Sequence, residues 1–138
     1  MIGVDTNVLL RWLVDETVWP IDNPDQVVHA TRILSDSRER FFINNVVLAE
    51  AVWVLNKPLK QRKPVLVDLL RRLFEASNVE IERRDAAADA IAAFAAGGGG
   101  FSDYLIGAIN RHGGCDTTLT FDRKAGWPAD FTRLGSRP

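Results

Sequence analysis

The 138-residue sequence has only one cysteine, Cys115, and two histidines. A single cysteine excludes an internal disulfide and a cysteine-based zinc site, and it favours a reducing, cytosolic setting. No apolar run approaches the length of a membrane span, and Asp5 interrupts the apolar start, so we expect neither a membrane segment nor a signal peptide. The net charge of −1 provides no global basic field of the kind that indicates nucleic-acid binding.

The rest of the composition is ordinary for a globular protein, with 46% hydrophobic and 25% charged residues. At this length we expect one domain, residues 1–138, with a sizeable core. Apolar runs typical of strands alternate with helical patterns, which predicts an α/β fold with a mostly parallel sheet of about five strands covered on both faces. The expected strands lie near residues 1–4, 41–43, 79–82, 117–121 and 131–134.

Helices are expected over about residues 8–15, 24–35, 46–56, 65–75, 86–96 and 103–112. Their predicted capping residues are Asp5, Asn23, Asn44 or Asn45, Asp85 and Ser102. The helix over 46–56 is apolar on nearly every side, so we expect it to be buried. Gly97–Gly100 predicts a flexible hinge, because four glycines are costly to order inside an element.

Four acidic residues occupy places where a surface charge is a weaker explanation. Asp5 and Asp122 each follow a predicted strand, Asp103 lies in the first turn of a helix, and Glu50 lies on the apolar helix with no partner three or four residues away. Each has a structural alternative: a cap for Asp5, an exposed stripe or a distant arginine for Glu50, a dipole effect for Asp103, and a turn or surface ion pair for Asp122.

Together the four carboxylates indicate a cation site. Oxygen-only ligand sets suit Mg²⁺ or Mn²⁺, whereas clustered carboxylates without a cation repel one another. One or two such cations can clamp the two oxygens exchanged at a phosphorus atom. His112 is expected only to complement a helix C-terminus, and Cys115 to be a small buried hydrophobe.

Four segments carry a family resemblance that covers essentially the whole chain. They are Ile-Gly-Val-Asp5-Thr-Asn, Asn-Asn-Val-Val-Leu-Ala-Glu50 followed by Val-Trp-Val-Leu, Phe-Ser-Asp103-Tyr-Leu-Ile, and Leu-Thr-Phe-Asp122. In their order and spacing the sequence resembles PIN-domain proteins, and specifically the VapC-type toxins of bacterial toxin–antitoxin pairs.

The resemblance implies a PIN-like three-layer α/β/α sandwich whose first strand is central, and a Mg²⁺-dependent endoribonuclease. It places Asp5, Glu50, Asp103 and Asp122 in an acidic metal site, with Thr6, Asn7 and Thr120 as supporting polar residues. It also implies a homodimer silenced by a cognate VapB-type antitoxin, which lays a C-terminal helix into a groove near the active site.

On this basis the sequence predicts hydrolysis of RNA by a metal-activated water, leaving a 5′-phosphate and a 3′-hydroxyl. Asp5, Glu50 and Asp103 would hold the principal metal and Asp122 a second, weaker position. RNA contacts are expected from a set of basic residues, for each of which a solvated surface charge is the alternative: Lys57, Lys60, Arg62, Lys63, Arg123 and Lys124.

Other classes fit the residues less well. An aspartyl phosphatase needs a second acid two residues after Asp5, where this chain has Asn7, and a phosphoreceiver domain needs paired acids before the acceptor strand. A non-catalytic PIN-fold binding module remains an alternative that metal titration separates from a nuclease. The sequence does not identify the RNA substrate or the dimer surface. Candidates for the dimer surface, if they are not in the core, are Trp12, Trp19 and Trp53.

Overall fold

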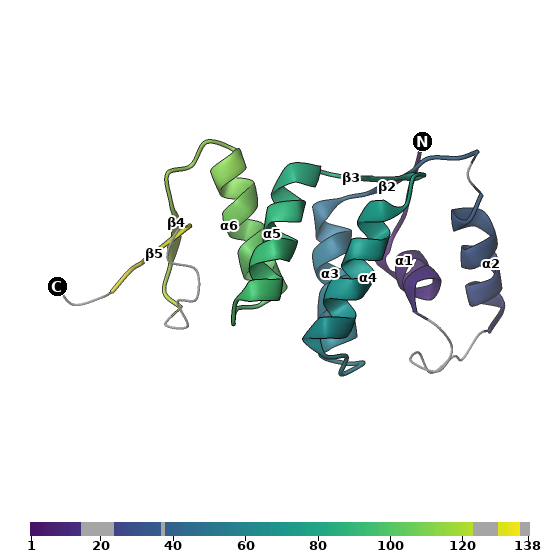
Figure 1. Ribbon diagram of the computed structural model, residues 1–138, viewed down its shortest axis with the longest axis horizontal. Coiled ribbons are helices and arrows are strands. Elements are labelled where there is room, and N and C mark those ends of the chain that lie inside the picture. The colour runs from purple at the N-terminus through teal and green to yellow at the C-terminus, as the bar shows by residue number, and fades with distance from the viewer. Residues whose placement is uncertain (15–23, 37, 123–129, 136–138) are drawn as a thin grey trace. The chain divides into compact units, whose positions relative to one another are not determined.

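The computed structural model describes residues 1–14, 24–36, 38–122 and 130–135 (Figure 1). Within these residues it has six helices and five strands. The chain divides into two compact units, Met1–Glu82 and Arg83–Pro138. In the described part of the chain, no helix is long and apolar enough to cross a membrane.

Unit 1 contains a parallel three-stranded sheet in the order β1-β2-β3. Its strands are β1 (Ile2–Gly3), β2 (Phe41–Ile43) and β3 (Val79–Ile81), with Phe41 paired to Ile2 on one side and to Val79 on the other. In β2 and β3 the outer residues are buried and the middle one is half-buried, which fits the alternation predicted near residue 80.

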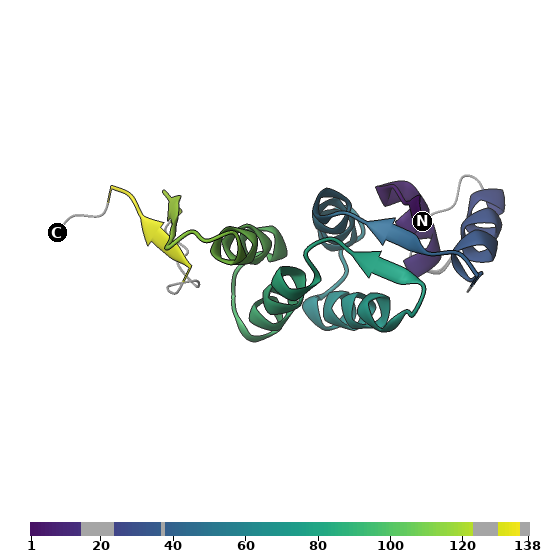
Figure 2. The same ribbon diagram turned by 90° about the horizontal axis from the view of Figure 1, so that it is seen from above.

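Four helices complete unit 1: α1 (Thr6–Leu13), α2 (Pro24–Leu34), α3 (Asn45–Asn56) and α4 (Lys63–Glu75). Helix α1 packs against α2 and α3, and α4 packs against α3 and β3. Figure 2 shows α1 and α4 on opposite sides of the sheet. The core between these layers contains fully buried leucines, Leu9, Leu10, Leu48, Leu66 and Leu73.

Capping residues begin α1 and α3 as the sequence predicts. The side chain of Asp5 accepts a hydrogen bond from Val8 N at 3.0 Å, and that of Asn44 accepts one from Val47 N at 2.8 Å. Helix α2 begins at Pro24 as expected, while Asn23 lies outside the described residues. Buried Asn45 donates its side-chain amide to Glu82 O at 2.8 Å, which ties the start of α3 to the end of β3.

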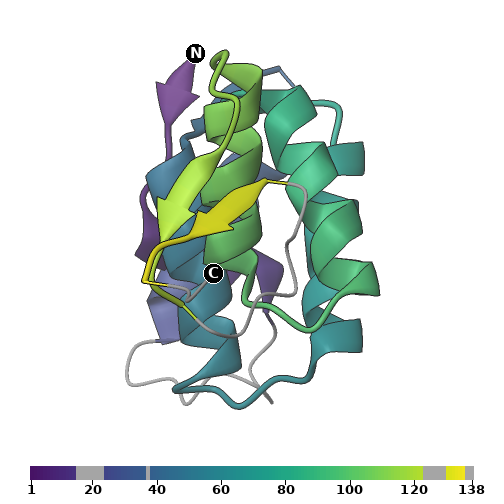
Figure 3. The same ribbon diagram turned by 90° about the vertical axis from the view of Figure 1, so that its left-hand side faces the viewer.

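Unit 2 contains the helices α5 (Arg84–Ala96) and α6 (Phe101–His112) and the parallel strand pair β4 (Thr118–Thr120) and β5 (Phe131–Arg133). Helices α5 and α6 pack side by side, as Figure 3 shows. Phe94 of α5 and Phe101 of α6 meet edge to face, with ring centroids 5.7 Å apart. Three small alanines, Ala86, Ala87 and Ala90, are among the buried residues of α5.

The strand arrangement differs from the sequence prediction. The five described strands form a three-stranded and a two-stranded sheet, so a single sheet of five strands is not shown, and β2 is the central strand of the larger sheet. Ile2 is 46% exposed, although its apolar surroundings in the sequence predicted a strand buried on both faces. Because β1 lies at an edge of its sheet, its side chains have fewer neighbours than those of β2.

The predicted burial of α3 was wrong along one stripe. Val46 is 68% exposed and Trp53 58% exposed, and Glu50 lies exposed between them. A helix that is apolar all round has no periodicity to mark its outward side, so the sequence alone could not locate the stripe.

Three local predictions in unit 2 were also wrong. Asp85 and Ser102 lie inside the first turns of α5 and α6, whose capping positions are Arg83 and Gly100. Polar residues are favourable in a first turn as well as at the cap, because several backbone N–H groups are unpaired there. Cys115 is exposed rather than buried, since it follows the glycines that end α6.

Candidate acidic site

Asp5 lies where the first strand ends and the first helix begins. Val4 is buried and its N–H donates to Phe42 O at 3.0 Å, so strand pairing continues up to the residue before Asp5. Asp5 itself is exposed and has extended backbone angles, and one of its carboxylate oxygens caps α1. The capping role expected as an alternative is therefore real, and it leaves the second oxygen available for a ligand.

Glu50 is brought to the same place from the middle of α3. Thr6, the residue after Asp5, donates its hydroxyl to Glu50 Oε1 at 3.0 Å across 44 residues of sequence. No lysine or arginine in the described part of the chain forms an ion pair with Glu50. Glu50 is thus on an exposed stripe, as its alternative explanation held, and that stripe faces the beginning of α1.

Asn7 lies on the rim of a cleft beside these residues. The cleft has a volume of about 430 Å³ and runs between α1 and α2, with Asp5, Val8 and His29 among its lining residues. The backbone oxygen of Asn7 accepts a hydrogen bond from Arg11 Nη1 at 3.2 Å. The supporting residue Asn7 therefore borders a hollow that reaches Asp5.

Unit 2 brings together the other two acids. Asp103 is the third residue of α6 and is partly buried; this burial, and secondly the negative charge of Asp122, raise the pKa of Asp103 above its ordinary value. Asp122 follows β4, and its N–H donates to Thr120 Oγ1 at 3.0 Å. Thr120 therefore contacts the backbone of Asp122, and its supporting role stays a prediction.

The donor chemistry of both pairs suits a hard divalent cation. Asp5 with Glu50, and Asp103 with Asp122, offer only oxygen ligands. The pKa of Asp103 is raised first by burial and second by the negative charge of Asp122, and a nearby cation would offset both effects. Among the described residues, no group of three or more acidic, histidine or cysteine side chains is placed to hold a metal ion.

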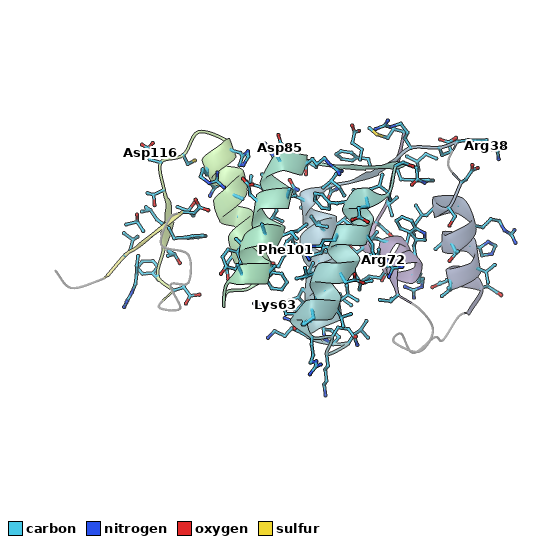
Figure 4. All side chains as sticks on the ribbon, viewed as in Figure 1. Arg38, Lys63, Arg72, Asp85, Phe101 and Asp116 are labelled. Carbon is cyan, nitrogen blue, oxygen red and sulfur yellow. The ribbon has the colours of Figure 1, made fainter. Side chains whose placement is uncertain are left out.

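Three of the six basic residues predicted to contact RNA lie in the connection between α3 and α4. Lys57, Lys60 and Arg62 are exposed and form no ion pair with any described residue, and Lys63, at the start of α4, is half-buried (Figure 4). Lys57 follows Glu50 by two helical turns on the same side of α3, roughly 10 Å along its axis. Arg123 and Lys124 lie outside the described residues.

Sequence reasoning missed an ion-pair network in unit 2. Arg111 of α6 donates to Asp89 Oδ2 of α5 at 3.1 Å and to Asp130 Oδ1 at 3.0 Å, and His112 Nε2 lies 2.7 Å from Asp89 Oδ2. Hydrogen bonds from His112 and then Arg111 lower the pKa of Asp89. The only sequence signal was the basic last turn of α6, which was interpreted as a dipole effect. The network joins α5, α6 and the residue before β5.

The parallel sheet with helices on both sides in unit 1 defines an α/β protein, and carboxylates at a strand end and on an adjoining helix offer oxygen ligands in that unit. The PIN-domain family model matches residues 2–127, so the chain belongs to the PIN-domain family. The PIN fold is generally a nuclease fold, and PIN domains typically bind divalent metal ions. No curated protein sequence matches the chain at the significance required of a match.

Proposed function

We propose that this PIN-domain protein is a Mg²⁺-dependent endoribonuclease of the VapC type that hydrolyses RNA phosphodiester bonds in the cytoplasm. The observation that carries the proposal is the hydrogen bond from Thr6 to Glu50. It supports the proposal because it joins a glutamate of α3 to the residue that follows Asp5, in a chain whose family is generally nucleolytic. An exposed surface glutamate would need no such partner.

In this proposal the two carboxylate pairs hold the cation, with Asp5, Glu50 and Asp103 at the principal position and Asp122 at a weaker one. Thr6 fixes the Glu50 carboxylate, and Thr120 fixes the backbone of Asp122. When bound, Mg²⁺ lowers the pKa of a water molecule and offsets negative charge on the phosphate. The products are a 5′-phosphate and a 3′-hydroxyl.

RNA binding is proposed for the exposed connection of Lys57, Lys60 and Arg62. These side chains are free of ion pairs among the described residues, so their charges are available for phosphates. The position of Lys57, two helical turns from Glu50, suits an RNA strand whose scissile phosphate lies at the acids. Lys63 extends the same patch.

A homodimer and a VapB-type antitoxin are the proposed protein partners. Of the candidate tryptophans, Trp53 is mostly exposed on α3, Trp12 is half-buried in α1, and Trp19 lies outside the described residues. Trp53 is therefore the described tryptophan that best supports a partner contact. A Trp53→Ala variant that retains the oligomeric state of the wild type in light scattering would remove this support.

The test compares RNA cleavage by the wild type with that by Asp5→Asn and Asp103→Asn, both shown to be folded. Asparagine is also a good cap, so Asp5→Asn removes the charge while keeping the start of α1. Asp116→Asn is the matched control, because Asp116 lies exposed in the segment between α6 and β4 (Figure 4).

We expect wild-type cleavage to stop in EDTA and to return with Mg²⁺ or Mn²⁺. Both site variants should lose at least about 10–100-fold, the range seen when only a metal's outer-shell partners are removed, and the control should match the wild type. Undiminished cleavage by either folded site variant would overturn the nuclease mechanism. Metal binding without cleavage would favour the non-catalytic binding module instead.

A further inference from the structure

The glycine run before Asp103 is held by the residue that follows Asp103. Tyr104 is the only tyrosine of the chain and its side chain is buried. Its hydroxyl accepts a hydrogen bond from Gly99 N at 3.2 Å, and its own backbone N–H donates to Gly100 O at 3.3 Å. Tyr104 therefore hydrogen-bonds to Gly99 through the end of its side chain and to Gly100 through its backbone.

Gly97 lies close to the same hydroxyl group. A Cβ atom placed on Gly97 would overlap the Tyr104 hydroxyl, whereas a Cβ on Gly98 would meet nothing within 4 Å. Neither residue has a positive φ, so space rather than backbone conformation separates the two positions. The absence of a side chain at Gly97 is what allows the tyrosine to reach Gly99.

The last glycine of the run lies beside the Asp103 carboxylate. A Cβ on Gly100 would lie 3.5 Å from Asp103 Oδ2, so this oxygen is near the residue at the capping position of α6. The glycine run was expected to be a flexible hinge, but Tyr104 forms hydrogen bonds to it next to one of the proposed metal ligands. Phe94 and Phe101, one at each side of the run, fix its two ends through their ring contact.

We propose that Tyr104 is a positioning residue for Asp103: its hydroxyl holds the Gly97–Gly100 loop in the conformation that seats the Asp103 carboxylate for cation binding. The proposal rests on the proposed function for the identity of the cation. The tyrosine itself contacts neither substrate nor metal, and it acts through Gly99 and Gly100. A tyrosine that only filled the core would serve equally well without its hydroxyl.

The experiment compares three variants of the full chain with the wild type. Tyr104→Phe removes the hydroxyl and keeps the ring, Gly97→Ala pushes the hydroxyl away, and Gly98→Ala is the matched control that adds the same methyl group in open space. Both glycine-to-alanine changes reduce the conformational freedom of the unfolded chain equally. A difference in behaviour between the two variants therefore reports on the contact between the Tyr104 hydroxyl and the glycine run. Readouts are amide hydrogen exchange at Gly99, thermal unfolding, and Mn²⁺ binding measured by water-proton relaxation with Mg²⁺ as competitor.

We expect Tyr104→Phe and Gly97→Ala to speed exchange at Gly99 and to weaken Mn²⁺ and Mg²⁺ binding about two- to tenfold, the effect of one lost hydrogen bond. The melting temperature of Tyr104→Phe should fall by no more than a few degrees, and Gly98→Ala should bind like the wild type. If Tyr104→Phe binds the ions as tightly as the wild type, or if Gly98→Ala weakens binding as much as Gly97→Ala, the positioning role is wrong. A wild type that binds neither ion would instead refute the metal chemistry of the proposed function.

Discussion

At the scale of single residues, two of the carboxylates proposed to bind the cation also make hydrogen bonds within the fold. Asp5 caps α1 with one oxygen, and Glu50 accepts the Thr6 hydroxyl. Each bond uses one carboxylate oxygen and orients the other. A residue chosen only for helix stability would not also need to be acidic, because asparagine, serine and threonine cap helices equally well.

The raised pKa of Asp103 predicts a stability gain when its charge is removed. Burial and the Asp122 charge make the folded protein hold the Asp103 proton more tightly than the unfolded chain does, so stability falls as pH rises through the window above the ordinary carboxyl pKa. Without metal at pH 7, Asp103→Asn should therefore be more stable than the wild type. The gain should be no more than about 1 kcal/mol, because the helix dipole favours the anion and acts in the opposite sense.

Urea unfolding in EDTA at pH 7 and at about pH 3 checks this prediction. At the lower pH the wild-type carboxyl is protonated too, so the difference between the two proteins should disappear. An Asp103→Asn variant that is less stable than the wild type at pH 7 would contradict it, and exposed Asp116→Asn should show no gain at either pH.

At the scale of elements, a glycine in the middle of α6 sets how closely β5 can approach. A Cβ on Gly107 would lie 2.7 Å from the Phe131 ring and 3.1 Å from Asp130 Cβ. Alanine at this position favours the helix by about 1 kcal/mol, whereas overpacking typically costs 1–3 kcal/mol. The cost of the close contact outweighs the gain in helix propensity, so the net effect on stability should be unfavourable. Helix α6 should remain, and the β4–β5 pair should be displaced from it.

The prediction for Gly107→Ala is a local loosening of the strand pair. Amide exchange at Thr118 and Leu134, which pair with Asp130 and Thr120, should become faster, while exchange within α5 should change little. Gly3→Ala adds a methyl group in open space and is the control. Unchanged exchange at both amides would show that the Phe131 ring absorbs the added methyl group without moving its strand.

At the scale of the whole molecule, the family match over residues 2–127 extends through both compact units. Asp5 and Glu50 lie in unit 1, and Asp103 and Asp122 lie in unit 2. A cation that binds the native protein and not the unfolded chain stabilises the native protein. Mg²⁺ at a hundred times its dissociation constant should add about 2.7 kcal/mol to the free energy of unfolding.

We therefore expect Mg²⁺ to raise the melting temperature of the wild type and EDTA to reverse the rise. Asp5→Asn and Asp103→Asn, which alter different units, should both lose most of this increase, whereas Asp116→Asn should retain it. Thermal unfolding followed by circular dichroism measures the effect. An equal increase in all four proteins would indicate that the ion binds elsewhere.

Much of this protein follows from its sequence because the signals are local. Apolar periodicity indicated the helices and the short strands, and capping residues such as Asp5 and Asn44 marked where helices begin, since a cap needs only the backbone a few residues away. The same local reasoning placed Asp122 after a strand and Asp103 in a first turn. It failed at Asp85 and Ser102, where the first turn and the cap favour the same residue types.

Only the tertiary structure decided the features that join distant residues. The pairing of strands into two sheets, the bond from Thr6 to Glu50 across 44 residues, and the outward stripe of α3 all depend on which surfaces meet. The glycine run shows the difference most clearly: its composition indicates conformational freedom, whereas in the structure Gly99 N donates to the Tyr104 hydroxyl five residues away. Local propensity depends on residues a few positions apart in the chain, whereas packing depends on the shape of the surface that a segment meets. A single stretch of sequence contains the first kind of information but not the second.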